Sequence, residues 1–434
     1  MMKLFPLFIL FLQVLSFTHL GLAQPNQCGQ PEDKARTLKV FHVSSPCSPL
    51  KPKNKSWEEG VIQTMIEDKA RLQYLTSLVA RKSVAPLAWA RQLIQSPTYI
   101  VRVKVGTPPQ SFLMALDTSS DAAWLPCSGC VGCGSTLFAP QKSTTFKDIA
   151  CDAPQCHQVT NPTCTLNLCT FNQTYGGYTL GAALSQDTIA LAQDPIPNYV
   201  FGCIQKSTGA SVPPQGLLGL GRGPYSLLSQ TQSLYRSTFS YCLPSFRSSK
   251  FSGSLRLGPV AQPKKMHYTR LLMNPRRPSL YYVNLLGIKV GSKILNIPPE
   301  VLAFNPTNGA GTVIDSGTVY TRLAQPAYNA VRDEIRHRMG KAKMTSLGGF
   351  DTCYSDPIKV PSITFMFEGM NTTLAPENFL LHSTATSIAC LAMSASPDNP
   401  NSVLNVIANM QQQNHRVFFD IPNNRIGIAR ENCT

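Results

Sequence analysis

The sequence has few long apolar runs, and none after the first two dozen residues is long enough to cross a membrane. The final residues, GIARENCT, have no hydrophobic tail of the kind that precedes a lipid anchor. The formal net charge is +16, yet nowhere do five Lys or Arg residues follow one another. Phosphate binding needs clustered cations, so we expect neither a membrane anchor nor a nucleic-acid partner.

The N-terminus has the pattern of a cleaved secretory signal. Lys3 precedes the apolar run LFPLFILFLQVLSF, and the small-residue site Gly21-Leu22-Ala23 follows. A membrane anchor is the alternative interpretation, but the run is shorter than the ~20 apolar residues that a spanning helix needs. We therefore expect residues 1–23 to be a signal peptide that is cut after Ala23, and the protein to be secreted.

The cysteines fit an oxidising compartment. Cys28 and Cys47 lie early in the chain. The others predict about six disulfides with the pairing left open, and they are Cys127, Cys130, Cys133, Cys151, Cys156, Cys164, Cys169, Cys203, Cys242, Cys353, Cys390 and Cys433. The C-x-x-C-x-x-C run at 127–133 could hold zinc or an iron–sulfur cluster instead. However, the secretory route oxidises thiols, and no His or fourth Cys has metal-site spacing, so we expect no metal and no cofactor.

Sequons for N-glycosylation occur at Asn54, Asn172, Asn371 and Asn432. Asn161 is followed by proline, which excludes it. We expect Asn172, Asn371 and Asn432 to carry glycans on the body of the protein.

Residues 24–97 differ in character from the rest of the chain. Ser56 and Glu59 form a capping-box pattern, which predicts the start of a helix. Apolar residues then recur at helical spacing, at Val61, Ile62, Met65, Ile66, Leu72, Leu75 and Val79. The charged face includes Asp68, Lys69 and Arg71, with Arg81 and Lys82 at its end. A helical leader with a basic end, ahead of a β-rich body, predicts a prosegment; a plain helix docked on the domain is the alternative.

From about Tyr99 the pattern changes to short strands. TYIVRVKVG and SFLMALD are separated by the turn GTPPQ, and similar runs recur to the end of the chain. Helical windows are few, and PAYNAVRDEIRHRMGKA is the clearest. The pattern predicts an all-β body of two lobes, over residues 98–265 and 266–434.

The body also carries a loose internal repeat. LDTSS is followed about a hundred residues later by GLLGLG, and IDSGT is followed about ninety residues later by VIANM. A lone Asp in such a stretch is usually a turn residue. Because Asp117 and Asp315 share this wider frame, we expect them to face each other in a cleft between the lobes.

Two neighbouring carboxylates can activate a water without a metal or a covalent intermediate. They share one proton and titrate as a unit, so one can deprotonate the water while the other polarises a scissile carbonyl. Thr118 and Ser316 are placed to tie the two loops together. Ser120 and Thr318 can bond the outer carboxylate oxygens, and Gly317 lets backbone approach closely.

Six stretches carry a resemblance to a known family: VGTPPQ, DTSSDAAWLPCSGC, NQTYGG, LLGLGRG, VIDSGTVYTRL and NMQQQNHRVFFDIPNNRIGIAR. On these, residues 99–430 resemble a pepsin-type (A1) aspartic protease of the plant branch that includes nepenthesins and chloroplast-nucleoid proteases. The resemblance implies a bilobal pepsin-like fold with the active-site cleft between two β lobes, and Asp117 and Asp315 as catalytic residues. It also implies a monomeric acid endopeptidase, made as a zymogen, that acts on proteins or peptides in the cell wall, the apoplast or the vacuole.

The same resemblance implies roles in substrate binding. Tyr175, followed by Gly176 and Gly177, matches the flap tyrosine that closes over substrate. Trp124 matches the tryptophan that steadies this tyrosine.

Three residues depart from the family pattern. Ser119 stands where most members have Gly and adds a hydroxyl beside the catalytic backbone. Asp121 replaces a commoner Asn, and Ala408 replaces the usual Gly under the second loop. None of the three removes a proton-transfer group.

Two other functions compete with an active protease. A catalytically silent binding protein on the same fold, like plant inhibitors of xylan-degrading enzymes, typically loses one of the catalytic groups, and here only Ser119 and Ala408 favour it. A DNA-associated protease conflicts with the secretory signal and the scattered charge.

The leader is expected to act through its charge. Its basic residues, on the helix and at Arg81 and Lys82, should lie against the cleft, where the two aspartates and Asp121 are negative near neutral pH. Acid weakens that attraction, which predicts conversion below about pH 5, in the range of ordinary carboxylate pKa values.

Overall fold

The computed structural model describes residues 35–45, 48, 50, 56–79, 99–175, 178–208, 215–245, 253–275, 277–355, 357–383, 386–397 and 404–433. The predictions for the signal peptide and for Cys28, Cys47, Asn54, Arg81, Lys82, Gly176 and Gly177 lie outside these residues.

The leader contributes a strand and a long helix, β1 (Thr37–His42) and α1 (Trp57–Val79). The elements of the first half of the body are β2 (Tyr99–Val105), β3 (Gln110–Asp117), β4 (Trp124–Val131), β5 (Lys147–Asp148), β6 (Thr163–Thr165), β7 (Leu168–Tyr175), β8 (Tyr178–Leu191), β9 (Asp194–Thr208), β10 (Leu217–Gly219), α2 (Leu227–Gln230), α3 (Gln232–Tyr235), β11 (Thr238–Cys242) and β12 (Gly253–Leu257).

The elements of the second half are β13 (His267–Leu272), β14 (Tyr282–Val283), β15 (Leu285–Val290), β16 (Lys293–Ile294), α4 (Pro299–Leu302), β17 (Gly311–Ile314), β18 (Thr321–Leu323), α5 (Gln325–Met339), β19 (Met344–Leu347), β20 (Phe350–Ser355), β21 (Ile363–Phe367), β22 (Met370–Leu374), β23 (Leu380–His382), β24 (Ile388–Leu391), β25 (Met393–Ala395), β26 (Leu404–Ile407), α6 (Asn409–Gln412), β27 (His415–Asp420) and β28 (Arg425–Arg430).

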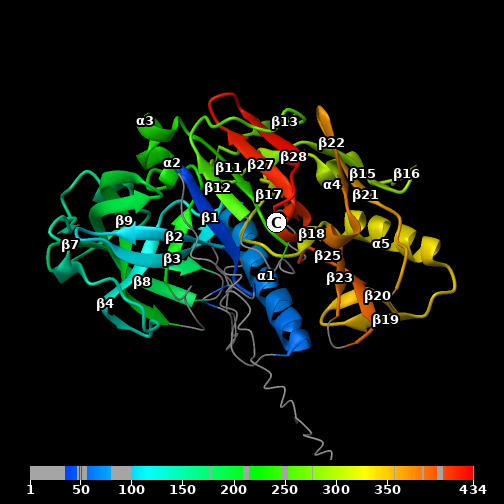
Figure 1. Ribbon diagram of the computed structural model, residues 1–434, viewed down its shortest axis with the longest axis horizontal. Helices are drawn as coiled ribbons and strands as arrows, with labels where there is room; N and C mark the ends of the chain where they lie inside the picture. Colours follow the sequence, from blue (N-terminus) through cyan, green and yellow to red (C-terminus); the bar gives the residue numbers. More distant parts are fainter. Residues whose placement is uncertain are drawn as a thin grey trace, which may run out of the picture.

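These strands build two lobes joined by a central sheet. In the part of the chain that the structure describes, they form one 20-stranded sheet and two four-stranded sheets, β16-β15-β21-β22 and β19-β20-β24-β23. Figure 1 shows β4, β7, β8 and β9 on one side of the molecule, and β15, β16 and β19 to β23 with α5 on the other. The all-β, two-lobed fold predicted from the sequence is confirmed, and the predicted helix PAYNAVRDEIRHRMGKA is α5.

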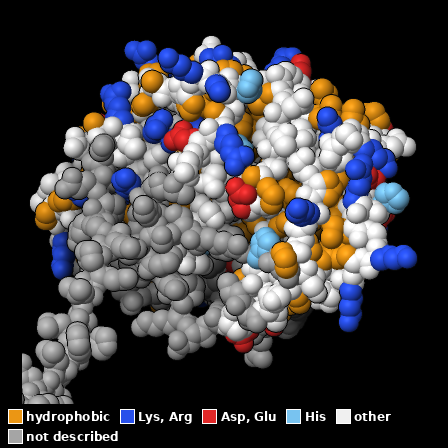
Figure 2. All heavy atoms as spheres, turned by 45° about the vertical axis from the view of Figure 1, so that its right-hand side comes forward, with side chains coloured by type: hydrophobic (Ala, Val, Ile, Leu, Met, Phe, Trp, Pro, Cys, Tyr) orange, Lys and Arg blue, Asp and Glu red, His pale blue; other side chains and the backbone are white. Residues whose placement is uncertain are grey.

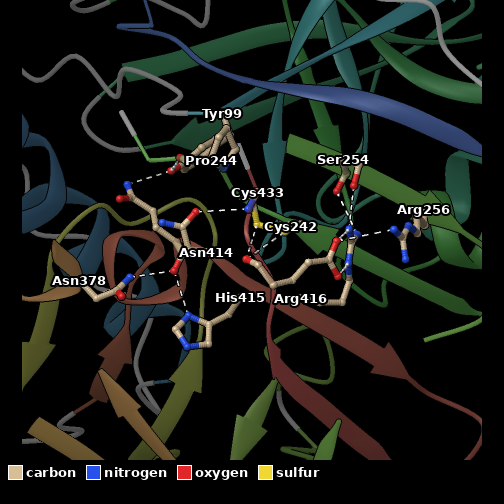
Figure 3. Close-up of a disulfide and its surroundings, with 12 residues drawn as sticks. Tyr99, Cys242, Pro244, Ser254, Arg256, Asn378, Asn414, His415, Arg416 and Cys433 are labelled. Atoms are coloured by element: carbon tan, nitrogen blue, oxygen red, sulfur yellow. Dashed lines mark hydrogen bonds and ion pairs between the residues drawn. A yellow bond between two sulfur atoms is a disulfide. The ribbon is translucent and has the colours of Figure 1, made fainter. Parts of the chain in front are cut away.

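The central sheet is fastened to the C-terminal end of the chain. β11 pairs with β27, and Cys242 at the end of β11 forms a disulfide with Cys433. Arg416 on β27 is buried, and its Nη2 donates to Ser254 Oγ at 2.8 Å while its Nε donates to Glu431 at 3.0 Å (Figure 3). Strands from both halves of the sequence are therefore held together by covalent, ionic and hydrogen bonds at one place.

The structure pairs the cysteines of the body in disulfides. The disulfides are Cys127–Cys203, Cys130–Cys133, Cys151–Cys164, Cys156–Cys169, Cys242–Cys433 and Cys353–Cys390. Because the sulfurs of the C-x-x-C-x-x-C run are bonded to other sulfurs, they are not thiolate ligands, and the alternative of a metal site there is set aside.

The leader is part of the fold. β1 pairs on one side with β12 and on the other with β2. α1 begins with the predicted capping box, in which Ser56 N–H donates to Glu59 at 2.9 Å and Glu59 N–H donates to Ser56 Oγ at 3.2 Å. In Figure 1 this helix, in blue, runs between the two sides of the body.

The buried face of α1 differs from the face that hydrophobicity predicts. Ile62 and Ile66 are 43% and 39% exposed, whereas Asp68 and Arg71, which the sequence pattern assigns to the charged outer face, are 2% and 1% exposed. The reason is that Asp68 and Arg71 find hydrogen-bonding and charged partners on the body, so their burial is compensated.

The positive charge is spread out on the face of the molecule drawn in Figure 2. Figure 2 shows Lys and Arg side chains standing singly or in small groups over one face, with no single basic tract.

The sequon residues Asn172, Asn371 and Asn432 are all exposed. Among the residues described, no helix combines the length and the apolar character that a membrane crossing requires.

Candidate active site

The two predicted Asp loops lie at the ends of equivalent strands. β3 ends at Asp117, and β10 runs parallel to it with Gly219 opposite Asp117. β17 leads directly into Asp315, and β26 runs parallel to it with Ile407 opposite Ile314. The repeat in the sequence therefore corresponds to a repeated pair of parallel strands, each carrying one aspartate at the same point.

Asp117 is buried and held by its own loop. Its Oδ1 accepts from the Ser119 N–H at 2.9 Å and from the Ser119 hydroxyl at 3.1 Å, and its Oδ2 accepts from the Ser120 hydroxyl at 2.8 Å. Because three donors surround one carboxylate, its position is fixed.

Asp315 is held in nearly the same way. Its Oδ1 accepts from the Gly317 N–H at 3.2 Å, and its Oδ2 accepts from the Thr318 hydroxyl at 2.5 Å. The difference between the loops is the missing side chain at Gly317, which leaves Asp315 without a counterpart to the Ser119 hydroxyl.

The two loops are tied to each other by a reciprocal pair of hydrogen bonds. The Ser316 N–H donates to Thr118 Oγ1 at 2.9 Å, and the Thr118 N–H donates to Ser316 Oγ at 3.1 Å. The hydroxyls of Thr118 and Ser316 therefore have the tying role that the sequence predicts.

Two buried amides, Asn409 and Gln412, support the second loop, and sequence reasoning did not single them out. Asn409 Nδ2 donates to the Ser316 carbonyl at 2.9 Å, and Gln412 Nε2 donates to the Asp315 carbonyl at 3.1 Å. The signal in the sequence is the run NMQQQN, because so many amides directly after an apolar strand need partners when they are buried.

The other departures from the family pattern cause no distortion. Asp121 does not join the pair; its Oδ1 accepts from the Gly223 N–H at 2.9 Å. Ala408 has φ −87° and ψ 173°, an extended conformation that any residue adopts, and its N–H donates to Thr321 Oγ1 at 3.0 Å.

Trp124 lies in the first lobe at the start of β4, 5% exposed, in an apolar cluster with Ala115, Leu180 and Leu217. Tyr175 ends β7 and pairs with Tyr178 across the hairpin to β8. This position at the end of a strand pair fits the predicted flap, and the roles of Tyr175 and Trp124 in substrate binding remain a proposal.

The space between the two carboxylates is occupied by Arg71 of α1. Its Nη1 and Nη2 donate to Asp117 at 3.0 and 2.7 Å, and its Nε and Nη2 donate to Asp315, each at 3.0 Å. Nη2 also contacts the hydroxyl of Ser119. One guanidinium therefore binds four carboxylate oxygens at once, and it is the basic residue of the helix that meets the cleft.

Gly317 provides the room for this guanidinium. A Cβ at residue 317 would lie 2.3 Å from Arg71 Nη2, closer than any real contact allows. The sequence predicts that Gly317 lets backbone approach closely, and in the structure its missing Cβ lets the side chain of Arg71 approach instead.

The apolar residues of α1 fix Arg71 in place. Leu72 and Leu75, both fully buried, pack with Tyr282, Val313 and Leu404 of the second lobe. A second cluster joins Val61 and Met65 to Tyr320 and Phe350. The leader therefore docks through two apolar clusters that flank its charged centre.

Comparison with known proteins gives a consistent result. Residues 99–259 match the family described as Xylanase inhibitor N-terminal, and residues 280–430 match the one described as Xylanase inhibitor C-terminal. The chain is 49% identical to Aspartyl protease AED3 of Arabidopsis thaliana, over 98% of each chain, and 34% identical to Aspartic proteinase nepenthesin-1 of Nepenthes gracilis, over 77% of this chain and 78% of that protein. Its fold is similar to the crystal structure of basic 7S globulin from soybean, with a TM-score of 0.62 and 20% identity over 77% of this chain and 93% of that one.

Proposed function

Because the chain belongs to the plant branch of the pepsin-type (A1) aspartic proteases and is an aspartic-type endopeptidase, we propose that it is made as a secreted zymogen and hydrolyses peptide bonds at acidic pH. The observation that carries this proposal is the single guanidinium of Arg71, which binds both carboxylates of the pair at once. While Arg71 lies between the two carboxylates, a substrate carbonyl cannot reach them. Once the leader leaves, the paired carboxylates are already in position for catalysis.

In the proposed mechanism Asp117 and Asp315 share one proton. The ionised carboxylate takes a proton from a water that lies between them, and the protonated one donates to the oxygen of the scissile carbonyl. Aspartic proteases are an established example of such a shared proton. The hydroxyls of Ser120 and Thr318 hold the outer oxygens, so the reacting oxygens stay aligned through the proton transfers.

Ser119→Gly is expected to move the alkaline limb of the pH–rate profile upward by roughly half a pH unit or more. The Ser119 hydroxyl donates to Asp117 and favours its charged form, so its loss lets the pair keep the shared proton to higher pH. The check is kcat/KM of the mature enzyme across pH, with melting temperature as the control for folding. An unchanged profile would mean that the hydroxyl does not act on the pair.

Acid is proposed to release the leader partly through His42 at the end of β1. Its ring lies edge-on to that of Tyr99, and its Nδ1 accepts from the Ser44 N–H at 3.1 Å. Burial lowers the pKa of His42 to about 3, whereas an exposed His titrates near ~6.5. Release therefore takes up a proton below about pH 6.5, and through this group each lower pH unit favours release about tenfold, down to about pH 3.

Asp68 acts in the opposite direction. Burial raises the pKa of Asp68 to about 6, although Arg322 and two backbone N–H groups lower it. After release it would titrate near ~3.9, so release gives up a proton between about pH 6 and 4, and acid favours docking over that range. The effects of His42 and Asp68 nearly cancel there. The ion pairs of Arg71, which weaken when either partner carboxylate is protonated, then decide conversion, which we place below about pH 5.

His42→Phe is expected to make conversion less steeply dependent on pH, by about one proton, and to move it to lower pH. His42 belongs to the leader, so a difference from the parent reports docking rather than catalysis. The measurement is the rate of conversion by gel electrophoresis from pH 3 to 7, with exposed His157→Phe as the control. A slope equal to that of the parent would remove His42 from the mechanism.

Secretion and monomeric state belong to the same proposal. The N-terminal signal pattern, the paired cysteines and the exposed sequons Asn172, Asn371 and Asn432 support passage through the secretory pathway, to the cell wall or apoplast or else to the vacuole. Protein and peptide substrates are the expected partners, with no nucleic acid and no membrane anchor.

A catalytically weak or silent binding protein is the second candidate, favoured by the description of the matching family as xylanase inhibitor. The test is acid incubation of the purified zymogen with a denatured protein, with and without a pepstatin-type inhibitor. Inhibitor-sensitive fragments are expected from the protease. No fragments between pH 2.5 and 6, even after the leader is removed, would favour the binding protein.

A further inference from the structure

The leader places a second charged side chain, Asp68, in a recess beside the catalytic pair. It lies one turn of α1 before Arg71 and is 2% exposed. Its Oδ1 accepts from the Val319 N–H at 2.9 Å, and its Oδ2 accepts from the Tyr320 N–H at 2.7 Å. Two neighbouring backbone donors therefore hold both oxygens of one carboxylate. A side-chain amide in the same position would turn its NH2 group toward one of these donors.

Arg322 on β18 forms the charged wall of this recess. It is 4% exposed, and its Nη2 donates to the Met65 carbonyl at 3.1 Å. Among the residues that the structure describes, its Nε has no hydrogen-bond partner. Asp68 is the carboxylate whose charge acts on this guanidinium. Because Met65 and Asp68 both belong to the leader, its removal takes away the acceptor and the opposite charge together.

The recess that remains would favour a carboxyl side chain. A guanidinium in a largely buried position is unfavourable without an acceptor or a counter-charge, and the Val319 and Tyr320 N–H groups would also lack their partner. A cavity of about 780 Å³ adjoins Arg322 and is bordered on the body side by Gly348, Ser394 and Ser396. A peptide that takes the place of α1 therefore has room to direct a side chain toward these donors.

We propose that the recess formed by Val319, Tyr320 and Arg322 is a substrate subsite that selects an Asp or Glu side chain. This proposal rests on the endopeptidase function proposed above. Val319 directly follows Thr318, whose hydroxyl donates to Asp315, so the recess lies on the Asp315 side of the pair and serves one position on one side of the scissile bond. In the zymogen, Asp68 occupies the recess in place of a substrate carboxylate.

The test uses the mature enzyme and synthetic peptides that differ only by Asp or Asn, scanned through each position on both sides of the scissile bond. At one position, kcat/KM at pH 5 should favour Asp by about tenfold or more, since a carboxyl group presents one oxygen to each N–H donor whereas Asn presents an oxygen to only one of them. At pH 3 the ratio should be no smaller, because burial raises the pKa of Asp68 in the same recess and acid therefore favours its docking.

Arg322→Gln should reduce the Asp-to-Asn ratio at that position at least about fivefold, while Arg322→Lys keeps part of it. Arg270→Gln, an exposed arginine on β13, is the matched control and should leave the ratio unchanged. If the parent cleaves none of the peptides, the proposed function fails. If it cleaves them with equal rates for Asp and Asn at every position, only the subsite fails. Should Arg322→Gln not fold, the Asp preference of the parent and its persistence at pH 3 decide the question.

Discussion

Asp117→Asn and Asp315→Asn should each lower proteolysis by about a thousandfold or more, while the protein keeps its fold and its disulfides. Water activation needs one group that accepts a proton and one that donates it, and an amide does neither at these pH values. Asn keeps the size of Asp and can still accept from the Ser120 or Thr318 hydroxyl, so the loops should stay in place. The measurement is kcat/KM on a peptide substrate.

Because an inactive variant cannot cut its own leader, the recognition sequence of an unrelated serine protease should be inserted after residue 97 in the parent and in all variants. Asp121→Asn is the matched control. Its carboxylate accepts from the Gly223 N–H, a bond that an amide oxygen can also accept, so activity should change little. If either Asp117→Asn or Asp315→Asn keeps activity within tenfold of the parent, these two residues are not the catalytic pair.

Arg71→Met is expected to raise the pH of zymogen conversion by about one unit or more. The substitution leaves two buried carboxylates under the helix with no cation between them. Removing one partner from a buried ion pair costs about 3–5 kcal/mol, which weakens docking by about two to four orders of magnitude. The measurement is the fraction converted after a fixed time between pH 3 and 7.

Lys69→Met removes the same charge from an exposed position on the same helix and should convert like the parent. Arg71→Lys should be intermediate, because one ammonium cannot reproduce the planar fork that binds four oxygens. If Arg71→Met stays latent over the same pH range as the parent, the leader is held mainly by Leu72, Leu75 and their apolar neighbours.

The two equivalent aspartate loops were predictable because the sequence around them is repeated. The frames around Asp117 and Asp315 repeat, and the structure brings both to the ends of parallel strand pairs. The tying hydroxyls of Thr118 and Ser316 were predictable for the same reason, since a residue type that recurs beside each aspartate indicates a shared task.

The position of the leader was not predictable to the residue. The positions of the basic residues in the sequence do not show that Arg71 is the one that reaches Asp117 and Asp315. That depends on which face of α1 is turned toward the body. Hydrophobicity predicts that face poorly here: Ile66 is 39% exposed, whereas Asp68 is buried against two backbone N–H groups. The identity of those partners depends on the chain about 250 residues away, which local patterns do not contain. Disulfide pairing was open for the same reason.

The position of β1 has a consequence for how the protein folds before and after maturation. Both of its edges are paired, to β12 and to β2, so it is an interior strand of the central sheet and not an attachment to its rim. If the leader is cut away, as we propose, the mature protein would keep a shape that its own sequence did not assemble alone. We expect such a molecule to persist because its unfolding barrier is high rather than because its folded state is the equilibrium one. Denatured mature protein should then fail to refold under conditions in which the denatured zymogen refolds.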